Sequence, residues 1–146
     1  MLSQARTILA VIGFTGMLSD FLVNFKFFGG PILVVMVLTM IYEWRVYEAM
    51  PGKMNALNER FHKITLNFFE KHGIRVVGFW QAIFGTSNTL YYMLAFENMA
   101  HREKAWATFT ADPDWIKARA ETEKEGPLVQ RVHNMLLKPT HYSPIK

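Results

Sequence analysis

A regular alternation of apolar and charged side chains begins at Ile41, and this pattern limits the available folds more than any other feature. In IYEWRVYEAMPGKM, residues 41–54, apolar or aromatic side chains alternate with charged ones, which is the two-residue period of a strand. Pro51 and Gly52 then form a turn. After the turn, apolar residues recur at steps of three and four, on one side of a helix: Met54, Leu57, Phe61, Ile64 and Phe68. The domain is therefore predicted to begin with a strand, a turn and a helix.

A hairpin is expected after this helix. Lys71 and His72 favour its carboxyl end, and Gly73 supplies a left-handed cap. The segments IRVVGFWQAIF (residues 74–84) and TLYYMLAF (residues 89–96) are rich in β-forming residues and are separated by four polar residues. Two such segments predict an antiparallel pair of strands.

A second helical region and a last strand complete the pattern. Asn98 is a good helix cap, and Asp112 followed by Pro113 predicts a restart of the helix. Gly126 and Pro127 end this region, and VQRVHNMLL at residues 129–137 predicts a final strand.

The predicted order is βαββαβ, an α+β fold of the ferredoxin-like, split βαβ type. Helices cover only one face of such a sheet, so the other face needs a partner. We expect this uncovered face to hold a set of polar and aromatic side chains and to meet a second copy in a homodimer. The set is Glu43, Arg45, Tyr47, Tyr91 and Met93.

Residues 1–39 differ from the rest because they contain only three charged side chains, Arg6, Asp20 and Lys26. Their two apolar runs are each shorter than the roughly 20 residues of a membrane-spanning helix, and no small-x-small motif suggests signal cleavage. This hydrophobic extension is either a membrane anchor or the product of a start codon placed too early. We expect residues 40–139 to form the domain, residues 140–146 a tail, and the protein to be cytoplasmic unless residues 1–39 attach it to a membrane.

Composition excludes several classes of function. The net charge of +4 comes from 16 basic and 12 acidic residues without a dense basic patch, so nucleic acid is not an expected partner. The chain has no cysteine, which excludes disulfides and thiolate metal sites. Its five histidines show neither metal-binding helical spacing nor a His-x-His motif, so no metal site is expected. Phosphate-binding and serine-nucleophile motifs are likewise missing from the sequence.

The motifs resemble one known family in order and spacing. IYEWRVYEAMPGKM is similar to the first strand and turn of NIPSNAP domains, and EKHGIRVVGFW, GTSNTLYYMLAFENMAHREKAWATFTADPDW and HNMLLKP resemble later segments of that family. The resemblance covers about residues 41–139. It implies a dimeric α/β barrel, in which two ferredoxin-like sheets pack together. The family's animal members are linked to mitochondrial and vesicle-related roles, while most bacterial members have no assigned activity, so the resemblance implies fold more than function.

Three alternating residues, Glu43, Arg45 and Tyr47, are the main candidates for a ligand site. They lie about 7 Å apart on one face of a strand, where Arg45 can hold an anion, Glu43 can act as a general base and Tyr47 can donate a hydrogen bond. The alternative is that Glu43 and Arg45 only neutralise each other or their dimer mates. Trp80 and Tyr91 are further candidates, in a pocket between sheet and helices that suits a polar-aromatic or anionic metabolite.

His101 is the last candidate, because some haem-degrading monooxygenases of the barrel superfamily carry their iron ligand at this place in the fold. The chain lacks the asparagine and tryptophan that accompany that histidine, so no cofactor is expected and haem remains an alternative. We therefore expect a protein of unassigned activity that binds a small ligand or a protein partner. The alternative is a small monooxygenase or isomerase of the same superfamily.

Overall fold

The computed structural model describes residues 24–27, 30–33 and 40–145, and the chain divides into two units, residues 1–37 and 38–146. In the first unit, β1 (Asn24–Phe27) pairs antiparallel with β2 (Gly30–Leu33). The two alternatives for residues 1–39, a membrane anchor and a start codon placed too early, otherwise concern residues outside the described ones. Within those residues, no helix has both the length and the apolar character needed to cross a membrane.

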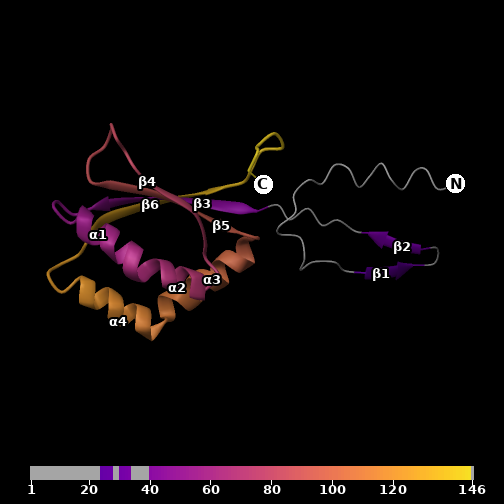
Figure 1. Ribbon diagram of the computed structural model, residues 1–146, viewed down its shortest axis with the longest axis horizontal. Coiled ribbons are helices and arrows are strands. Elements are labelled where there is room, and N and C mark those ends of the chain that lie inside the picture. Colours follow the sequence, from indigo (N-terminus) through magenta and orange to yellow (C-terminus); the bar gives the residue numbers. More distant parts are fainter. Residues whose placement is uncertain (1–23, 28–29, 34–39, 146) are drawn as a thin grey trace. The chain divides into compact units, whose positions relative to one another are not determined.

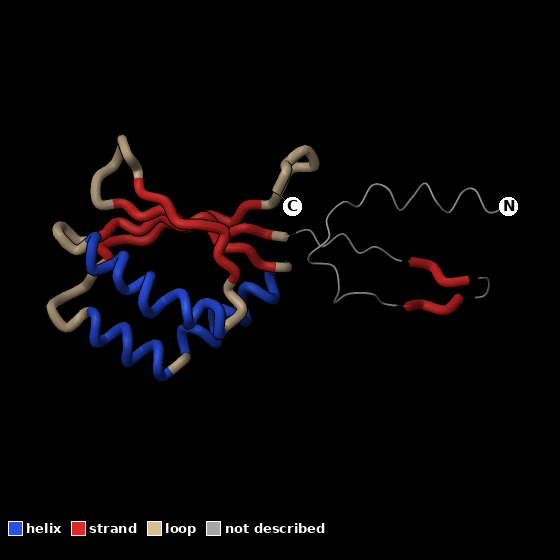
Figure 2. Tube along the Cα trace, viewed as in Figure 1, coloured by secondary structure: helices blue, strands red, loops and turns tan. Residues whose placement is uncertain are grey.

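The second unit is a four-stranded antiparallel sheet with its helices on one face (Figures 1 and 2). The sheet order is β4-β5-β3-β6, which confirms the predicted ferredoxin-like βαββαβ fold. The elements are β3 (Ile41–Ala49), α1 (Met54–Arg60), η1 (Phe61–Thr65), α2 (Leu66–Lys71), β4 (Arg75–Gln81), β5 (Thr89–Phe96), α3 (Met99–Ala111), α4 (Pro113–Thr122) and β6 (Val129–Leu137).

The predicted caps are present at the ends of the helices. Gly73 follows α2 with a φ of +70°, in the left-handed region that glycine favours. The Asn98 side chain accepts a hydrogen bond from the His101 amide at 2.9 Å at the start of α3. Asp112 caps α4, with its Oδ1 accepting from the Asp114 amide at 2.9 Å, and Pro113 is the first residue of that helix.

The first helical segment differs from the predicted apolar stripe in its second half. Leu57 and Phe61 are buried as expected, but Thr65 and Phe69 are buried after them, while Ile64 and Phe68, which the stripe includes, are only partly buried. The cause is the π-helical turn η1, which adds a residue to one turn and therefore moves the later buried positions along by one.

The structure corrects the predicted orientation of β3. Glu43, Arg45 and Tyr47 lie on the helix-covered face, paired across the sheet with Leu94, Tyr92 and Leu90. The open face instead carries Trp44, Trp80, Tyr91 and Met93. The Trp44 ring packs with its centroid 5.8 Å from that of Trp80 and 5.9 Å from that of Tyr91. Both faces of β3 carry aromatic side chains, so alternation alone does not say which face the helices cover. The charged face is the covered one because neighbouring elements supply its partners.

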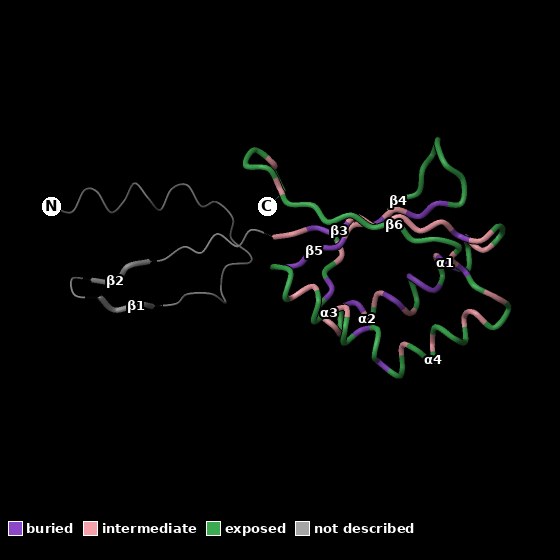
Figure 3. Tube along the Cα trace, turned by 180° about the vertical axis from the view of Figure 1, so that it is seen from behind, coloured by how far each residue is buried: buried purple, intermediate pink, exposed green. Residues whose placement is uncertain are grey.

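The core lies between the sheet and the helices, and Figure 3 shows buried stretches on β5 and α2. Leu57, Tyr92, Leu94 and Phe96 are fully enclosed. β6 is an edge strand, and it is exposed along almost its whole length. The helix side of the sheet is therefore densely packed near β5 and more open near β6.

Candidate functional site

Glu43 is a fully buried carboxylate surrounded by five hydrogen-bond donors. Its Oε1 accepts from Arg45 Nη1 at 2.6 Å, Arg102 Nη2 at 3.0 Å and Asn134 Nδ2 at 3.1 Å. Its Oε2 accepts from Arg102 Nε at 2.8 Å and Trp106 Nε1 at 2.9 Å. These donors come from β3, α3 and β6, so one carboxylate ties three elements together.

This environment keeps Glu43 ionised. Burial alone would raise the pKa of Glu43, but hydrogen bonds from Arg102, Asn134 and Trp106 and the charge of Arg45 lower it to about 2. A carboxylate with such a low pKa, and with both oxygens occupied by donors, is a poor general base at neutral pH. Glu43 instead fixes the positions of its partners.

Arg45 links Glu43 to a group of aromatic rings. Its Nε donates to Tyr92 Oη at 2.7 Å and its Nη2 to Tyr47 Oη at 3.3 Å, and its guanidinium lies 4.5 Å from the centre of the Trp106 ring. Burial opposes the charged form of Arg45, but the neighbouring Tyr92, Tyr47 and Glu43 raise its pKa above the usual value. Arg45 is therefore a permanently charged, oriented group.

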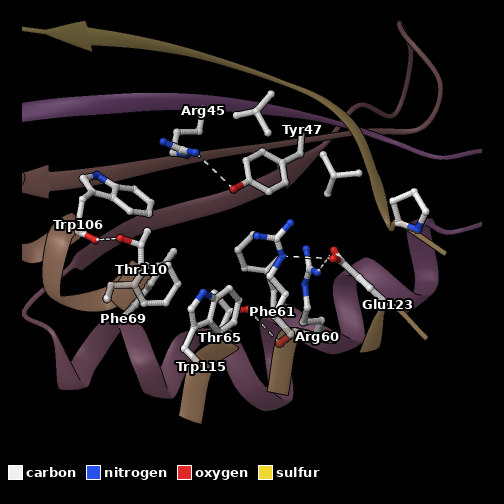
Figure 4. Close-up of a pocket in the computed structure, with 15 residues that line it drawn as sticks. Arg45, Tyr47, Arg60, Phe61, Thr65, Phe69, Trp106, Thr110, Trp115 and Glu123 are labelled. Carbon is white, nitrogen blue, oxygen red and sulfur yellow. Dashed lines mark hydrogen bonds and ion pairs between the residues drawn. The ribbon is translucent and has the colours of Figure 1, made fainter. Parts of the chain in front are cut away.

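Arg45 and Tyr47 form part of the wall of a cavity of about 320 Å³ between the sheet and the helices, which we call the sheet–helix cavity (Figure 4). This volume lies at the lower end of the range for small-molecule sites. The exposed residues of its lining place its mouth on the side of α3, α4 and β6: Thr110, Arg119, Pro127 and Val132. The lining residues are Arg45, Tyr47, Arg60, Phe61, Thr65, Phe69, Trp106, Phe109, Thr110, Trp115, Arg119, Glu123, Pro127, Val129 and Val132.

A second charged group lies on the helix side of the cavity. Glu123, at the carboxyl end of α4, accepts from Arg60 Nη1 at 2.6 Å and from Arg119 Nε at 3.2 Å. Arg60 retains only 6% of its accessible surface. Its Nε is buried and has no hydrogen-bond partner among the described residues. An unpaired buried donor is costly, so this atom calls for an acceptor.

The π-helical turn brings this wall into place. Arg60 immediately precedes η1, Phe61 and Thr65 lie within it, and all three line the cavity. Thr65 Oγ1 donates to the Arg60 carbonyl oxygen at 3.3 Å, five residues back. Turns of this kind are frequent at functional sites, because the extra residue redirects side chains.

The structure brings together three of the six candidate residues, Glu43, Arg45 and Tyr47. Arg45 and Tyr47 line the cavity, while Glu43 lies behind Arg45. Trp80 and Tyr91 pack with Trp44 on the opposite face of the sheet, so they are not part of the cavity wall.

His101 also lies outside the cavity lining. Its ring packs against Phe96 with centroids 5.8 Å apart, and its Nδ1 accepts from the Glu97 amide at 3.3 Å. His101 is therefore held against Phe96 and Glu97, and it does not supply a haem ligand to the wall of the sheet–helix cavity. In the described part of the chain, no three His, Asp or Glu side chains are grouped as metal ligands.

Sequence reasoning missed Arg60, Arg102, Arg119 and Glu123. Each of them had a partial signal in the sequence. Arg60 directly precedes Phe61 on the expected buried stripe, and Arg102 precedes Trp106 by four residues on one side of a helix. Arg119 and Glu123 are also four residues apart, as in a helical ion pair. The pairing of Glu123 with Arg60 had no signal, because it spans 63 residues.

Comparison with known proteins assigns the family. The family model described as NIPSNAP matches residues 42–144. The chain belongs to the NIPSNAP family. Among curated NIPSNAP relatives, Protein NipSnap homolog 3A from Homo sapiens is 32% identical over 77 residues, and Protein NipSnap homolog 3B from Mus musculus is 29% identical over 75 residues. These matches cover 52% and 51% of this chain but only 30% of each relative, so the chain spans a minor part of their length.

Solved NIPSNAP structures share the fold. An uncharacterized NIPSNAP-like domain protein from Burkholderia xenovorans is 23% identical with a TM-score of 0.66, covering 73% of this chain and 90% of that one. A NIPSNAP family protein of unknown function from Agrobacterium tumefaciens is 24% identical with a TM-score of 0.67, covering 75% and 96%. At these identities the likeness supports the fold alone.

Proposed function

We propose that this NIPSNAP domain binds a small molecule in the sheet–helix cavity. The observation that carries the proposal is the cavity itself, whose walls combine aromatic rings with a few oriented polar groups. Phe61, Trp106 and Trp115 supply flat apolar surface, and Arg45 supplies a charge that is held in place from behind by Glu43. Predominantly apolar walls with few fixed polar groups are typical of small-molecule sites.

A purely structural role explains this arrangement less well. Side chains that serve only stability fill the interior to near-crystalline density, whereas here about 320 Å³ stays open beside the buried Arg60. An empty cavity and charged groups placed at its wall both cost stability, and binding offsets that cost.

The geometry gives less support to the catalytic alternative, a small monooxygenase or isomerase. Glu43 is the acid–base candidate, but its low pKa and its five donors leave it unsuited to proton transfer. Tyr47 and Arg45 are hydrogen-bonded to each other rather than to a common open point. Binding without chemistry is the simpler function for these residues.

The binding proposal is tested by ligand-observed NMR with a panel of anionic, neutral and cationic aromatic compounds. The panel is 3-phenylpropanoate, phenyl phosphate, 3-phenylpropan-1-ol and 3-phenylpropylamine. Thr110→Trp places an indole at an exposed lining position on α3, and Ala107→Trp is the matched control, since Ala107 is exposed on the same helix outside the lining. We expect binding to wild type and to Ala107→Trp and its loss in Thr110→Trp. Binding that Thr110→Trp leaves unchanged, or no binding by any compound, contradicts the proposal.

We also propose that the open face of the sheet meets a second copy of the chain. Trp80, Met135 and Leu137 remain 46%, 59% and 37% exposed on this face, next to the Trp44 and Tyr91 rings. Large apolar patches of this kind mark interaction sites, and a two-fold dimer needs only one self-complementary surface. The exposed edge strand β6 borders this surface, and unpaired edges are usually covered in an assembly.

A further inference from the structure

The charges around the sheet–helix cavity do not balance. Of its lining residues, three are arginines and one is a glutamate, Glu123, which is shared by Arg60 and Arg119. Behind the wall, Glu43 is likewise shared by Arg45 and Arg102. Four guanidinium groups therefore share two carboxylates in and behind the cavity wall, so every arginine has an acidic partner but the group keeps a net charge of +2.

Arg60 shows where this surplus is available. It is 6% exposed, its Nη1 donates to Glu123 at 2.6 Å, and its Nε has no partner within the described part of the chain. Figure 4 shows the Arg60 and Glu123 side chains together at the cavity wall, across from Arg45 and Tyr47. A guanidinium offers its donors in one plane, and it pairs with carboxylate or phosphate oxygens through two neighbouring N–H groups.

Aromatic rings make up much of the rest of the cavity wall. Trp106 and Phe109 lie with ring centroids 5.6 Å apart, and Phe109 and Trp115 with centroids 4.6 Å apart, and all three rings line the cavity. Aromatic walls of this kind hold flat or apolar groups. A ligand that suits both the arginines and the rings is an amphipathic anion.

We propose that the sheet–helix cavity is an anion site: it takes an organic carboxylate or phosphate with an aromatic or apolar body, and Arg60 is its principal anchor. This inference rests on the proposed binding function and adds the chemical class of the ligand. In it, Glu123 acts as an internal competitor, because its carboxylate occupies the guanidinium groups that the ligand's acidic group approaches. Arg119, at the exposed mouth of the cavity, adds attraction over a longer range.

This role of Glu123 predicts that its substitution strengthens ligand binding instead of weakening it. Glu123→Gln removes the competing charge, so it should tighten binding of 3-phenylpropanoate and phenyl phosphate by at least about threefold. Glu121→Gln is the matched control, because it changes the net charge by the same amount near the same end of α4. Glu121 is 67% exposed and is paired with Lys124. Arg60→Met should weaken both anions by about tenfold or more, with Lys63→Met as its control on the neighbouring exposed surface.

The affinities are measured by titrating each compound of the panel into the full chain and following tryptophan fluorescence. Trp44→Phe and Trp80→Phe are introduced first, so that the signal comes from Trp106 and Trp115 at the cavity. We expect the two anions to bind at least about tenfold more tightly than the alcohol and the amine. The ratio between 3-phenylpropanoate and phenyl phosphate then states which acidic group the site prefers.

Three results overturn the inference while the binding proposal stands: equal or tighter binding of the alcohol, equal or tighter binding of the amine, or anion affinity that Glu123→Gln leaves unchanged or weakens. In each of these cases the cavity is occupied but is not an anion site. Loss of binding by the whole panel, or binding insensitive to Thr110→Trp, overturns the binding function itself. Because Glu123→Gln predicts a gain, a variant that merely misfolds cannot produce the expected result.

Discussion

Replacing Glu43 by glutamine tests the role of the buried charge network. The variant keeps the shape of the side chain but removes its charge, and it directs an amide N–H₂ toward donors that now approach a carboxylate oxygen. Arg45 and Arg102 would then stay largely buried, with side chains 12% and 19% exposed, without their shared counter-ion. Removing one partner of a buried ion pair costs about 3–5 kcal/mol.

This loss is a large part of the stability of an ordinary domain, which is about 5–15 kcal/mol. Since 1 kcal/mol corresponds to about 4 °C for a domain of this size, we expect Tm to fall by about 12–20 °C. The measurement is thermal unfolding followed by circular dichroism, with urea unfolding as a second estimate of the free energy of unfolding. Glu59→Gln is the matched control, because Glu59 is an exposed carboxylate on α1 paired with Lys63, and its Tm should match wild type.

A fall in Tm of less than about 4 °C for Glu43→Gln would refute this reasoning, because it would place the worth of the network below about 1 kcal/mol. The same result would also remove the explanation for the fixed position of Arg45. A loss of similar size in Glu59→Gln would show that glutamate substitutions destabilise the chain for another reason.

Further predictions concern acid stability, the α4 cap, the open face and one turn. The pKa of Glu43 is about 2 when folded and 4.5 as its ordinary value, so its contribution to stability is complete above pH 4.5 and is lost as the pH falls toward 2. Between pH 4.5 and 2 the free energy of unfolding should therefore fall less in Glu43→Gln than in wild type, and an equal fall would contradict the low pKa. Hydrogen bonds from Lys71 and, to a smaller extent, His72 hold the pKa of Asp112 well below its usual range. Asp112→Asn should therefore lower Tm at pH 7, and a Tm equal to that of wild type would contradict the pairing. From the proposed dimer, wild type and Ile116→Arg, which is exposed on α4, should sediment as dimers in analytical ultracentrifugation and Trp80→Arg as a monomer. A dimer of Trp80→Arg, or a monomer of wild type, would exclude the open face as a dimer interface. Gly73→Ala should cost about 1 kcal/mol in urea unfolding because φ is +70°, and a cost near zero would argue against the left-handed cap.

Local sequence patterns predicted the elements of the domain well. The bounds of β5 and β6 follow from their β-rich runs to the residue, and the Asp112–Pro113 restart follows from helix-start chemistry. These features depend on neighbours along the chain, which is why periodicity and caps reveal them. The predicted second strand, residues 74–84, is shorter in the structure because Ile83 and Phe84 lie in an exposed loop.

The candidate site was less predictable because it depends on contacts between distant segments. Alternation placed Glu43, Arg45 and Tyr47 on one face but could not say which face the helices cover. The partner Asn134 lies 91 residues from Glu43 along the chain, and the η1 turn shifts Thr65 into the wall against the regular helical period. Arg60 becomes a candidate only when its unpaired Nε and its place beside the cavity are known.

Occupancy of the sheet–helix cavity is tested most directly by native mass spectrometry of the protein purified from its own cells. Wild type and Ala107→Trp should carry a non-covalent small molecule that is released on denaturation and detected as a negative ion. Thr110→Trp, with an indole in the cavity, should lack it. The same bound molecule in Thr110→Trp, or wild type without any bound molecule, would contradict a ligand-binding role for this cavity.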